Sequence, residues 1–132
     1  MPGNPEGLII LKNYSEGLHL DFEYESDVTE QTLQIENGLL FLMAFWSGPS
    51  VVGFRNVCER LNRLALPEGF QFRVLDIDGA SEILNNLAEY DVVIGGNAEG
   101  YWFKNGKIIA STVCQTGTPE RITEIVDEIY DR

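Results

Sequence analysis

The apolar and polar residues of the chain follow two periods, and these predict the order of its secondary-structure elements. Residues 18–25 alternate between apolar and polar side chains, which is the period of a half-buried strand. Residues 39–46 are an uninterrupted apolar run, typical of a strand covered on both faces at the centre of an α/β sheet. Residues 51–64 place apolar side chains at helical spacing, and residues 70–78 predict another strand. This order implies a parallel βαβ unit with a right-handed crossover.

The C-terminal half predicts a helix, a hairpin and a final helix. Residues 79–90 have one apolar face at helical spacing. Asn105-Gly106 separates the apolar runs 101–103 and 108–114, and this dipeptide between two such runs is a strong hairpin signal. A threonine followed by a proline then predicts the start of a terminal helix over residues 119–130.

The N-terminal part is less regular, and we treat residues 1–27 as an acidic extension that packs on one domain formed by residues 28–132. Residues 2–7 are interpreted as a disordered leader, and residues 8–11 as a short apolar run before a turn-like segment. The length of 132 residues and the hydrophobic content of 44% predict one compact domain.

Two structures compete for the segment before the central apolar run. Asp27 and Glu30 have the spacing of an N-cap and its reciprocal acid, so a helix over residues 28–36 would end at Asn37-Gly38. Alternatively, residues 32–35 are a strand of a hairpin that turns at the same dipeptide. We favour the helix.

Charge narrows the classes of partner. Among 132 residues, 9 Lys and Arg face 21 Asp and Glu, a net charge of −12, so a nucleic-acid partner is not expected. Residues 1–38 hold eight acids and one base, or −7, which leaves thirteen acids and eight bases, or −5, for residues 39–132. No apolar stretch approaches the ~20 residues of a membrane helix, and the N-terminus lacks a secretory signal. We therefore expect a cytoplasmic protein, no membrane partner, and an acidic surface that suits a basic protein.

The residues that could carry redox or metal chemistry are sparse. Cys58 and Cys114 are the two cysteines, they form no CxxC pair, and His19 is the only histidine, so neither a metal cluster nor a disulfide is indicated. Both thiols are expected to be buried. Asp76 and Asp78 alternate at a strand end, where we expect them to cap the next helix and meet solvent. No metal and no cofactor is predicted.

Two anchors give the chain a family resemblance. The central apolar run ends at Trp46-Ser47-Gly48-Pro49-Ser50, a later hairpin turns at residues 103–107, and residues 76–78 end a strand with acids. Over residues 28–130 this order resembles thioredoxin, whose buried strand ends at Trp-Cys-Gly-Pro-Cys. The resemblance implies a three-layer α/β/α sandwich, in which a mixed central sheet is followed by a C-terminal β-hairpin and helix.

The same resemblance shows which chemistry is missing. Ser47 and Ser50 stand where the family has its two cysteines, and a hydroxyl without an activating base cannot exchange with a disulfide. Phe41 aligns with the family's buried aspartate. No proline lies near Gly96 or Ala98, the two alternative places for the family's cis-proline. Ser47 has no histidine nearby in the sequence and no Gly-x-Ser-x-Gly elbow, so we expect it to cap a helix rather than act as a nucleophile.

We therefore predict a redox-inactive thioredoxin-like module that binds another protein, such as a chaperone, an assembly factor or an inhibitor of a basic partner. No catalytic residue is assigned. The predicted binding surface is the former substrate groove, lined by Trp46, Ser47, Gly48, Pro49, Ser50, Gly96, Asn97, Ala98 and Cys114. As an alternative to burial, the resemblance implies that Cys114 lies near Ser47 and is partly exposed, where it could form a mixed disulfide. The alternatives are a thiol-dependent oxidoreductase or transferase that uses Cys58 or Cys114, and a structural subunit of a larger complex.

Overall fold

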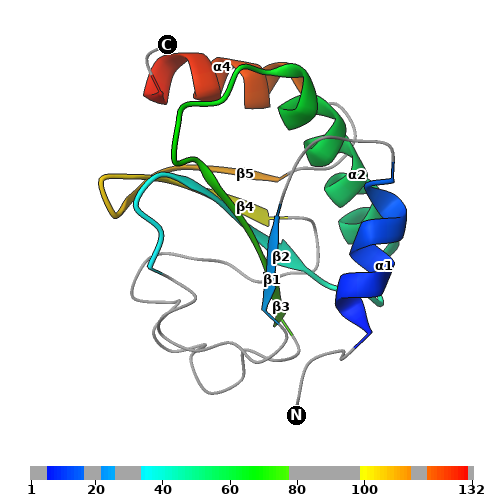
Figure 1. Cartoon of the computed structure of the whole chain (residues 1–132). Coiled ribbons are helices and arrows are strands. Elements are labelled where there is room, and N and C mark those ends of the chain that lie inside the picture. The colour runs from blue at the N-terminus through cyan, green and yellow to red at the C-terminus, as the bar shows by residue number, and fades with distance from the viewer. Residues whose placement is uncertain (1–5, 17–21, 26–33, 78–98, 114–118, 131–132) are drawn as a thin grey trace.

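The structure, a computed structural model, describes residues 6–16, 22–25, 34–77, 99–113 and 119–130. Figure 1 shows how the helices and strands are arranged in space. The elements in chain order are α1 (Gly7–Tyr14), β1 (Glu23–Glu25), β2 (Gly38–Met43), α2 (Gly48–Arg63), β3 (Gln71–Asp76), β4 (Glu99–Lys104), β5 (Lys107–Val113) and α4 (Pro119–Ile129).

The strands form one mixed sheet in the order β1-β3-β2-β4-β5. β1 and β2 both pair with β3 in parallel, whereas β4 pairs with β2 and β5 in antiparallel orientation. All six residues of β2 are buried at the centre of this sheet, as its apolar run predicts. The parallel β2-α2-β3 unit, the hairpin and the terminal helix are likewise confirmed, and with them the α/β class.

The hairpin turn between β4 and β5 has the conformation that its sequence predicts. Asn105 and Gly106 both have positive φ angles, 54° and 78°, as a two-residue type I′ turn requires. The Gly106 N–H donates to the Glu36 carbonyl oxygen over 2.9 Å, and the Asn105 N–H donates to Asn37 Oδ1 over 3.3 Å. The hairpin tip is therefore fixed to the segment that precedes β2.

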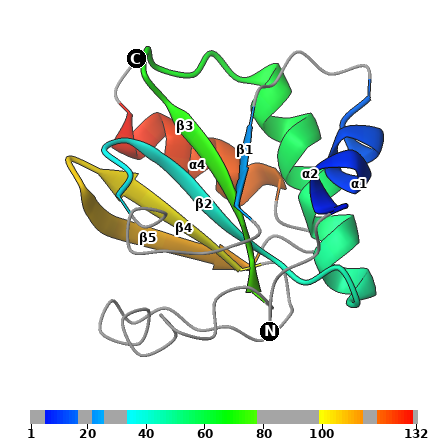
Figure 2. The ribbon, with the colours of Figure 1, turned by 60° about the horizontal axis from the view of Figure 1, so that its bottom comes forward.

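Three helices cover one face of the sheet, as Figures 1 and 2 show. Their buried residues form one apolar cluster with the strand residues that face them. α1 contributes Leu11, α2 contributes Phe54 and Leu61, and α4 contributes Ile122 and Val126. At the end of α4, the Tyr130 hydroxyl lies 3.1 Å from the Gly38 carbonyl oxygen and 2.5 Å from that of Phe103, so it ties this helix to the sheet.

The opposite face of the sheet carries a second apolar cluster. It consists of Ile35, Leu40, Leu42, Leu75, Tyr101 and Phe103. The helix predicted over residues 79–90, which would form the third layer of the sandwich, lies outside the described residues.

The structure corrects the sequence analysis in the N-terminal part. α1 is a helix where a leader, a short apolar run and a turn were expected. Residues 34–37 are neither helix nor strand, so the favoured helix does not reach Glu36, and residues 26–33 lie outside the described residues. The predicted strand at 18–25 is present as β1 at Glu23–Glu25, while residues 18–21 are also outside them.

Candidate functional site

The Ser-Gly-Pro-Ser segment forms the first turn of α2, directly after β2 and a short bend. Ser47 is the N-cap, with an extended backbone (φ −107°, ψ 120°), and its side chain accepts a hydrogen bond from the Ser50 N–H over 3.4 Å. Pro49 lies in the first turn, where its missing N–H costs nothing. The prediction that Ser47 caps this helix is therefore confirmed.

The second serine is integrated into the core. Ser50 is fully buried, and its Oγ accepts a hydrogen bond from the Ala44 N–H over 2.9 Å. The same hydroxyl lies 3.4 Å from Met43 Sδ, to which it can donate. Both partners belong to the end of β2 and the residue after it. Ser50 thus fastens the start of α2 to the central strand, and its hydroxyl is used by this structural role.

Behind this turn, an aromatic ring stands where the resemblance places an acid. Phe41 is fully buried, and its ring lies 5.7 Å from that of Phe54 in an edge-to-face arrangement. This side chain fills the space between the sheet and α2. It has no group that could exchange a proton with the turn.

A buried acid does exist nearby, on the adjacent strand. Asp76 pairs with Met43 in the sheet register and is fully buried, and the Tyr24 hydroxyl donates to its Oδ2 over 3.0 Å. The expectation that Asp76 meets solvent is therefore wrong, because β1 places a tyrosine over it. Asp78 lies outside the described residues.

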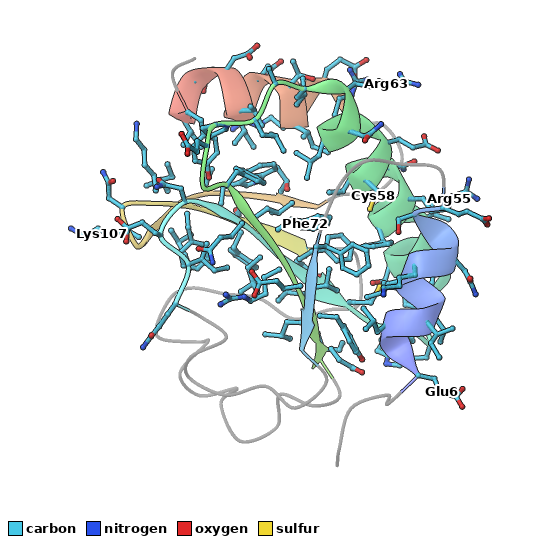
Figure 3. The ribbon with its side chains drawn as sticks, viewed as in Figure 1. Glu6, Arg55, Cys58, Arg63, Phe72 and Lys107 are labelled. Carbon is cyan, nitrogen blue, oxygen red and sulfur yellow. The ribbon has the colours of Figure 1, made fainter. Side chains whose placement is uncertain are left out.

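The start of α1 packs on the same tyrosine. A Cβ added to Gly7 would lie 2.2 Å from Tyr24 Oη and 2.8 Å from Phe45 Cζ, so only a glycine allows α1 to approach this closely. The rings of Tyr24 and Phe45 meet edge to face with centroids 5.9 Å apart. α1 is therefore set against the bend that joins β2 to α2, and in Figure 3 it lies beside α2.

Trp46 is the outstanding exposed residue of this region. Its side chain is 66% exposed on the bend, immediately before the buried Ser47. Three further apolar side chains on the adjoining helices are exposed: Leu8 and Ile9 on α1 and Val52 on α2. Trp46 was predicted from the sequence, whereas Leu8 and Ile9 were not, because their helix was not expected. We call these four residues the Trp46 surface.

The other predicted groove residues cannot be placed. Gly96, Asn97, Ala98 and Cys114 lie outside the described residues, as does His19. Among the residues that the structure does describe, no peptide bond is cis and no group of histidine, cysteine or acidic side chains is arranged to hold a metal ion.

The remaining cysteine is unsuited to thiolate chemistry. Cys58 is fully buried in the core cluster under α2, as predicted. Burial, with a smaller contribution from the Glu59 carboxylate, raises the pKa of Cys58 from 9.0 to about 12. Near neutral pH this side chain is therefore a protonated thiol, and neither a thiolate nucleophile nor a metal ligand is available there.

Comparisons with known proteins identify the fold. No protein-family model and no curated protein sequence matches the chain. Its structure is similar to thioredoxin from Malassezia sympodialis, with a TM-score of 0.64 and 16% identity over 85% of this chain and 93% of that one. It is also similar to thioredoxin from Trypanosoma brucei brucei, with a TM-score of 0.63 and 15% identity over 89% of this chain and 97% of that one. For thioredoxin O2 from Arabidopsis thaliana, the TM-score is 0.62 and the identity 19%, over 83% of this chain and 95% of that one. The chain thus has a thioredoxin fold.

In the described part of the chain, no helix is long and apolar enough to cross a membrane.

Proposed function

We propose that this thioredoxin-fold chain is a redox-inactive module that binds another protein through the Trp46 surface. The observation that carries the proposal is the contrast in exposure between the two serines and the tryptophan of one turn. The two serine side chains are buried and used to hold the turn, while the adjacent Trp46 is 66% exposed. Tryptophan is enriched among the residues that dominate binding energy at protein interfaces, so an exposed one on a fixed turn suits a contact better than a reaction.

Among the residues that the structure describes, the absence of a suitable thiol supports the redox-inactive half of the proposal. Ser47 and Ser50 offer hydroxyls, which do not exchange with disulfides, and Cys58 is a buried thiol whose pKa is raised to about 12. A thiol-dependent enzyme built on Cys58 is disfavoured by the same observations. Cys114 is the one remaining candidate thiol of that alternative.

The negative charge of the chain supports a basic protein as the partner. The chain carries a net charge of −12, and exposed Glu6 and Glu16 stand at the two ends of α1. A partner segment that combines apolar side chains with lysine or arginine would meet Trp46, Leu8 and Ile9 through the former and this acidic rim through the latter. Charged rims mainly raise the rate of association, and salt screens this effect.

The proposal is tested with the full chain and a Trp46→Ala variant. Proteins captured on each from an extract of the source cells are identified, purified and titrated against both. We expect Trp46→Ala to weaken binding about thirtyfold, the effect of losing about 2 kcal/mol at a central interface residue. Ile109→Ser is the control, because Ile109 is 47% exposed on β5, away from the Trp46 surface. A partner that binds Trp46→Ala as tightly as the native chain would contradict the site.

The redox half has its own measurement. An insulin-reduction assay with a dithiol as electron source should give no turnover above that of a Cys58→Ser/Cys114→Ser variant. Turnover that depends on either thiol would replace the binding function with the enzymatic one.

A further inference from the structure

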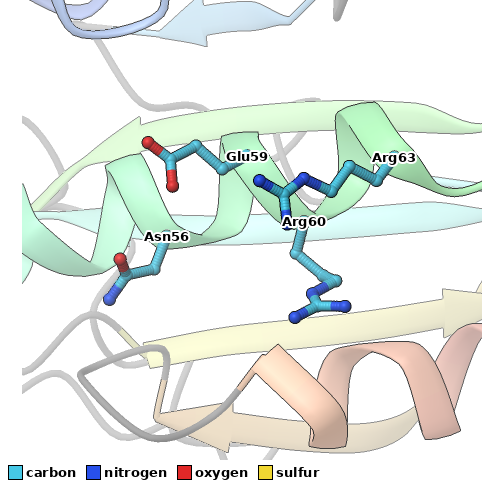
Figure 4. A pocket seen from close by; sticks show the side chains of 4 residues that line it. All are labelled: Asn56, Glu59, Arg60 and Arg63. Carbon is cyan, nitrogen blue, oxygen red and sulfur yellow. The ribbon is translucent and has the colours of Figure 1, made fainter.

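A small pocket lies on α2, in the half of the helix that is remote from Trp46. It has a volume of about 160 Å³ and is lined by Asn56, Glu59, Arg60 and Arg63. Asn56, Arg60 and Arg63 are four and three residues apart, so they follow one face of the helix. Figure 4 shows Arg60 reaching away from α2, with Arg63 one turn further along and Asn56 one turn before.

The two arginines have no acidic partner in the part of the chain that the structure describes. The ion pairs there join Arg55 to Glu59, Arg73 to Glu23, and Arg121 to Glu124. In a chain with 21 acids and 9 bases, a pair of arginines without an ion pair runs against the composition.

Glu59, the nearest acid to these arginines along α2, forms its ion pair with a different arginine. Glu59 stands four residues before Arg63, which is the order and spacing that favour an ion pair on a helix. It pairs instead with Arg55 on its other side, over 3.9 Å, and in Figure 4 its carboxylate and the Arg60 side chain leave the helix in different directions. Both guanidinium groups therefore stay available to a ligand.

We propose that this pocket binds a phosphate group. Guanidinium groups present a planar fork of N–H donors that matches phosphate oxygens, and the Asn56 amide adds a neutral donor. The pocket volume of about 160 Å³ is well above the ~10–15 Å³ that one water molecule needs by this measure, so a group of several heavy atoms such as phosphate fits. Glu59 also lines the pocket, and its negative charge opposes an anion there; its ion pair with Arg55 partly neutralises that charge.

The phosphate pocket is separate from the Trp46 surface. Arg60 follows Val52, the last residue of the Trp46 surface along α2, by eight residues, which corresponds to about 12 Å along the helix at 1.5 Å per residue. α2 would then present a protein-binding bend at its start and an anion site near its end. The proposal does not depend on the function proposed for Trp46.

The test is a titration of the isotopically labelled full chain with inorganic phosphate at constant ionic strength, followed by amide chemical shifts. We expect saturable shifts in α2, and about tenfold weaker binding in Arg60→Ala and in Arg63→Ala, the effect of losing a hydrogen bond to a charged group. Arg121→Ala is the matched control, because it removes the same charge from α4. Absence of saturable shifts in α2, or equal weakening by Arg121→Ala, would overturn the proposal.

Two further variants distinguish recognition by the guanidinium geometry from attraction by positive charge alone. Arg60→Lys/Arg63→Lys keeps both charges but loses the forks, and should bind phosphate about tenfold more weakly than the native chain. Glu59→Gln removes the opposing charge and should bind about twofold to fivefold more tightly. Unchanged affinity in both would contradict recognition in this pocket. Phosphoserine titrated alongside inorganic phosphate shows whether the group is taken as a monoester or as the free ion.

Discussion

At the scale of single residues, Ser50 has a structural role at the start of α2. Its hydroxyl is the acceptor for the buried Ala44 N–H, at 2.9 Å, and it is fully enclosed. A cysteine sulfur at this position would be a weaker hydrogen-bond acceptor than the serine oxygen. The serine oxygen is therefore better suited than a cysteine sulfur to join β2 to α2.

Removing this hydroxyl should destabilise the protein. Ser50→Ala leaves the Ala44 N–H buried without that acceptor, so we expect the free energy of unfolding in urea to fall by about 1–3 kcal/mol. The control is Ser111→Ala on β5, where the side chain is exposed and the change should stay within about 0.5 kcal/mol. Equal stability of the two variants would show that the Ser50 bond contributes nothing.

Some residue roles could be predicted from the sequence, and others could not. The N-cap role of Ser47 follows from a serine before Gly-Pro, a local pattern. The burial of Asp76 was missed because it depends on Tyr24, 52 positions away in the chain. The exposure of Trp46 agrees with its position in a turn. The lack of an ion pair at Arg63 was not predictable, because spacing alone favours a pair between Glu59 and Arg63, whereas Glu59 pairs with Arg55.

At the scale of elements, the same division between local and distant causes holds. β2, α2 and the β4-β5 hairpin were predicted because each is specified by its own residues, such as the apolar run of β2 or the positive φ angles of Asn105 and Gly106. α1 was missed because its apolar residues are consecutive rather than spaced at the helical period, and Glu6 makes no side-chain capping hydrogen bond. Packing of Leu11 into the core, rather than local signals, fixes this helix.

This account predicts that α1 can be displaced by one methyl group. Gly7→Ala places a Cβ 2.2 Å from Tyr24 Oη, and Tyr24 cannot withdraw freely because it donates to the buried Asp76. We expect a loss of about 1–3 kcal/mol in unfolding free energy, as for other overpacked sites, and faster limited proteolysis within α1.

Gly48→Ala provides the matched control for this helix. Gly48 lies in the first turn of α2, and a Cβ there would have nothing within 4 Å, so the variant should be as stable as the native chain or slightly more so. Resistance of Gly7→Ala to both effects would show that α1 is held by other contacts.

At the scale of the whole molecule, two buried titratable groups link the core to pH. Cys58 lies on the buried face of α2, and Tyr130 joins α4 to the sheet. Burial raises the pKa of Cys58 from 9.0 to about 12 and that of Tyr130 from 10.0 to about 12, although the hydrogen bond to Gly38 acts in the opposite direction on Tyr130. Both groups are uncharged when the folded state is most stable.

The sign of the pH dependence follows from proton binding. Above pH 9 the unfolded chain loses the Cys58 proton while the folded chain keeps it, and above pH 10 the same applies to Tyr130. Stability should therefore be unaffected by these groups below pH 9 and fall progressively between pH 9 and 12, by at most about 1.4 kcal/mol per pH unit for each group.

Urea unfolding at a series of pH values from 7 to 11 would measure this slope. Cys58→Ala and Tyr130→Phe each lower stability at neutral pH, through a lost contact or hydrogen bond, but each should also flatten the alkaline decline. In Cys58→Ala the decline attributable to burial should begin near pH 10, the usual pKa of tyrosine, instead of near pH 9. The rising negative charge of an already acidic chain acts equally on all variants. If stability falls with pH as steeply in both variants as in the native chain, charge repulsion, and not these two buried groups, governs alkaline unfolding.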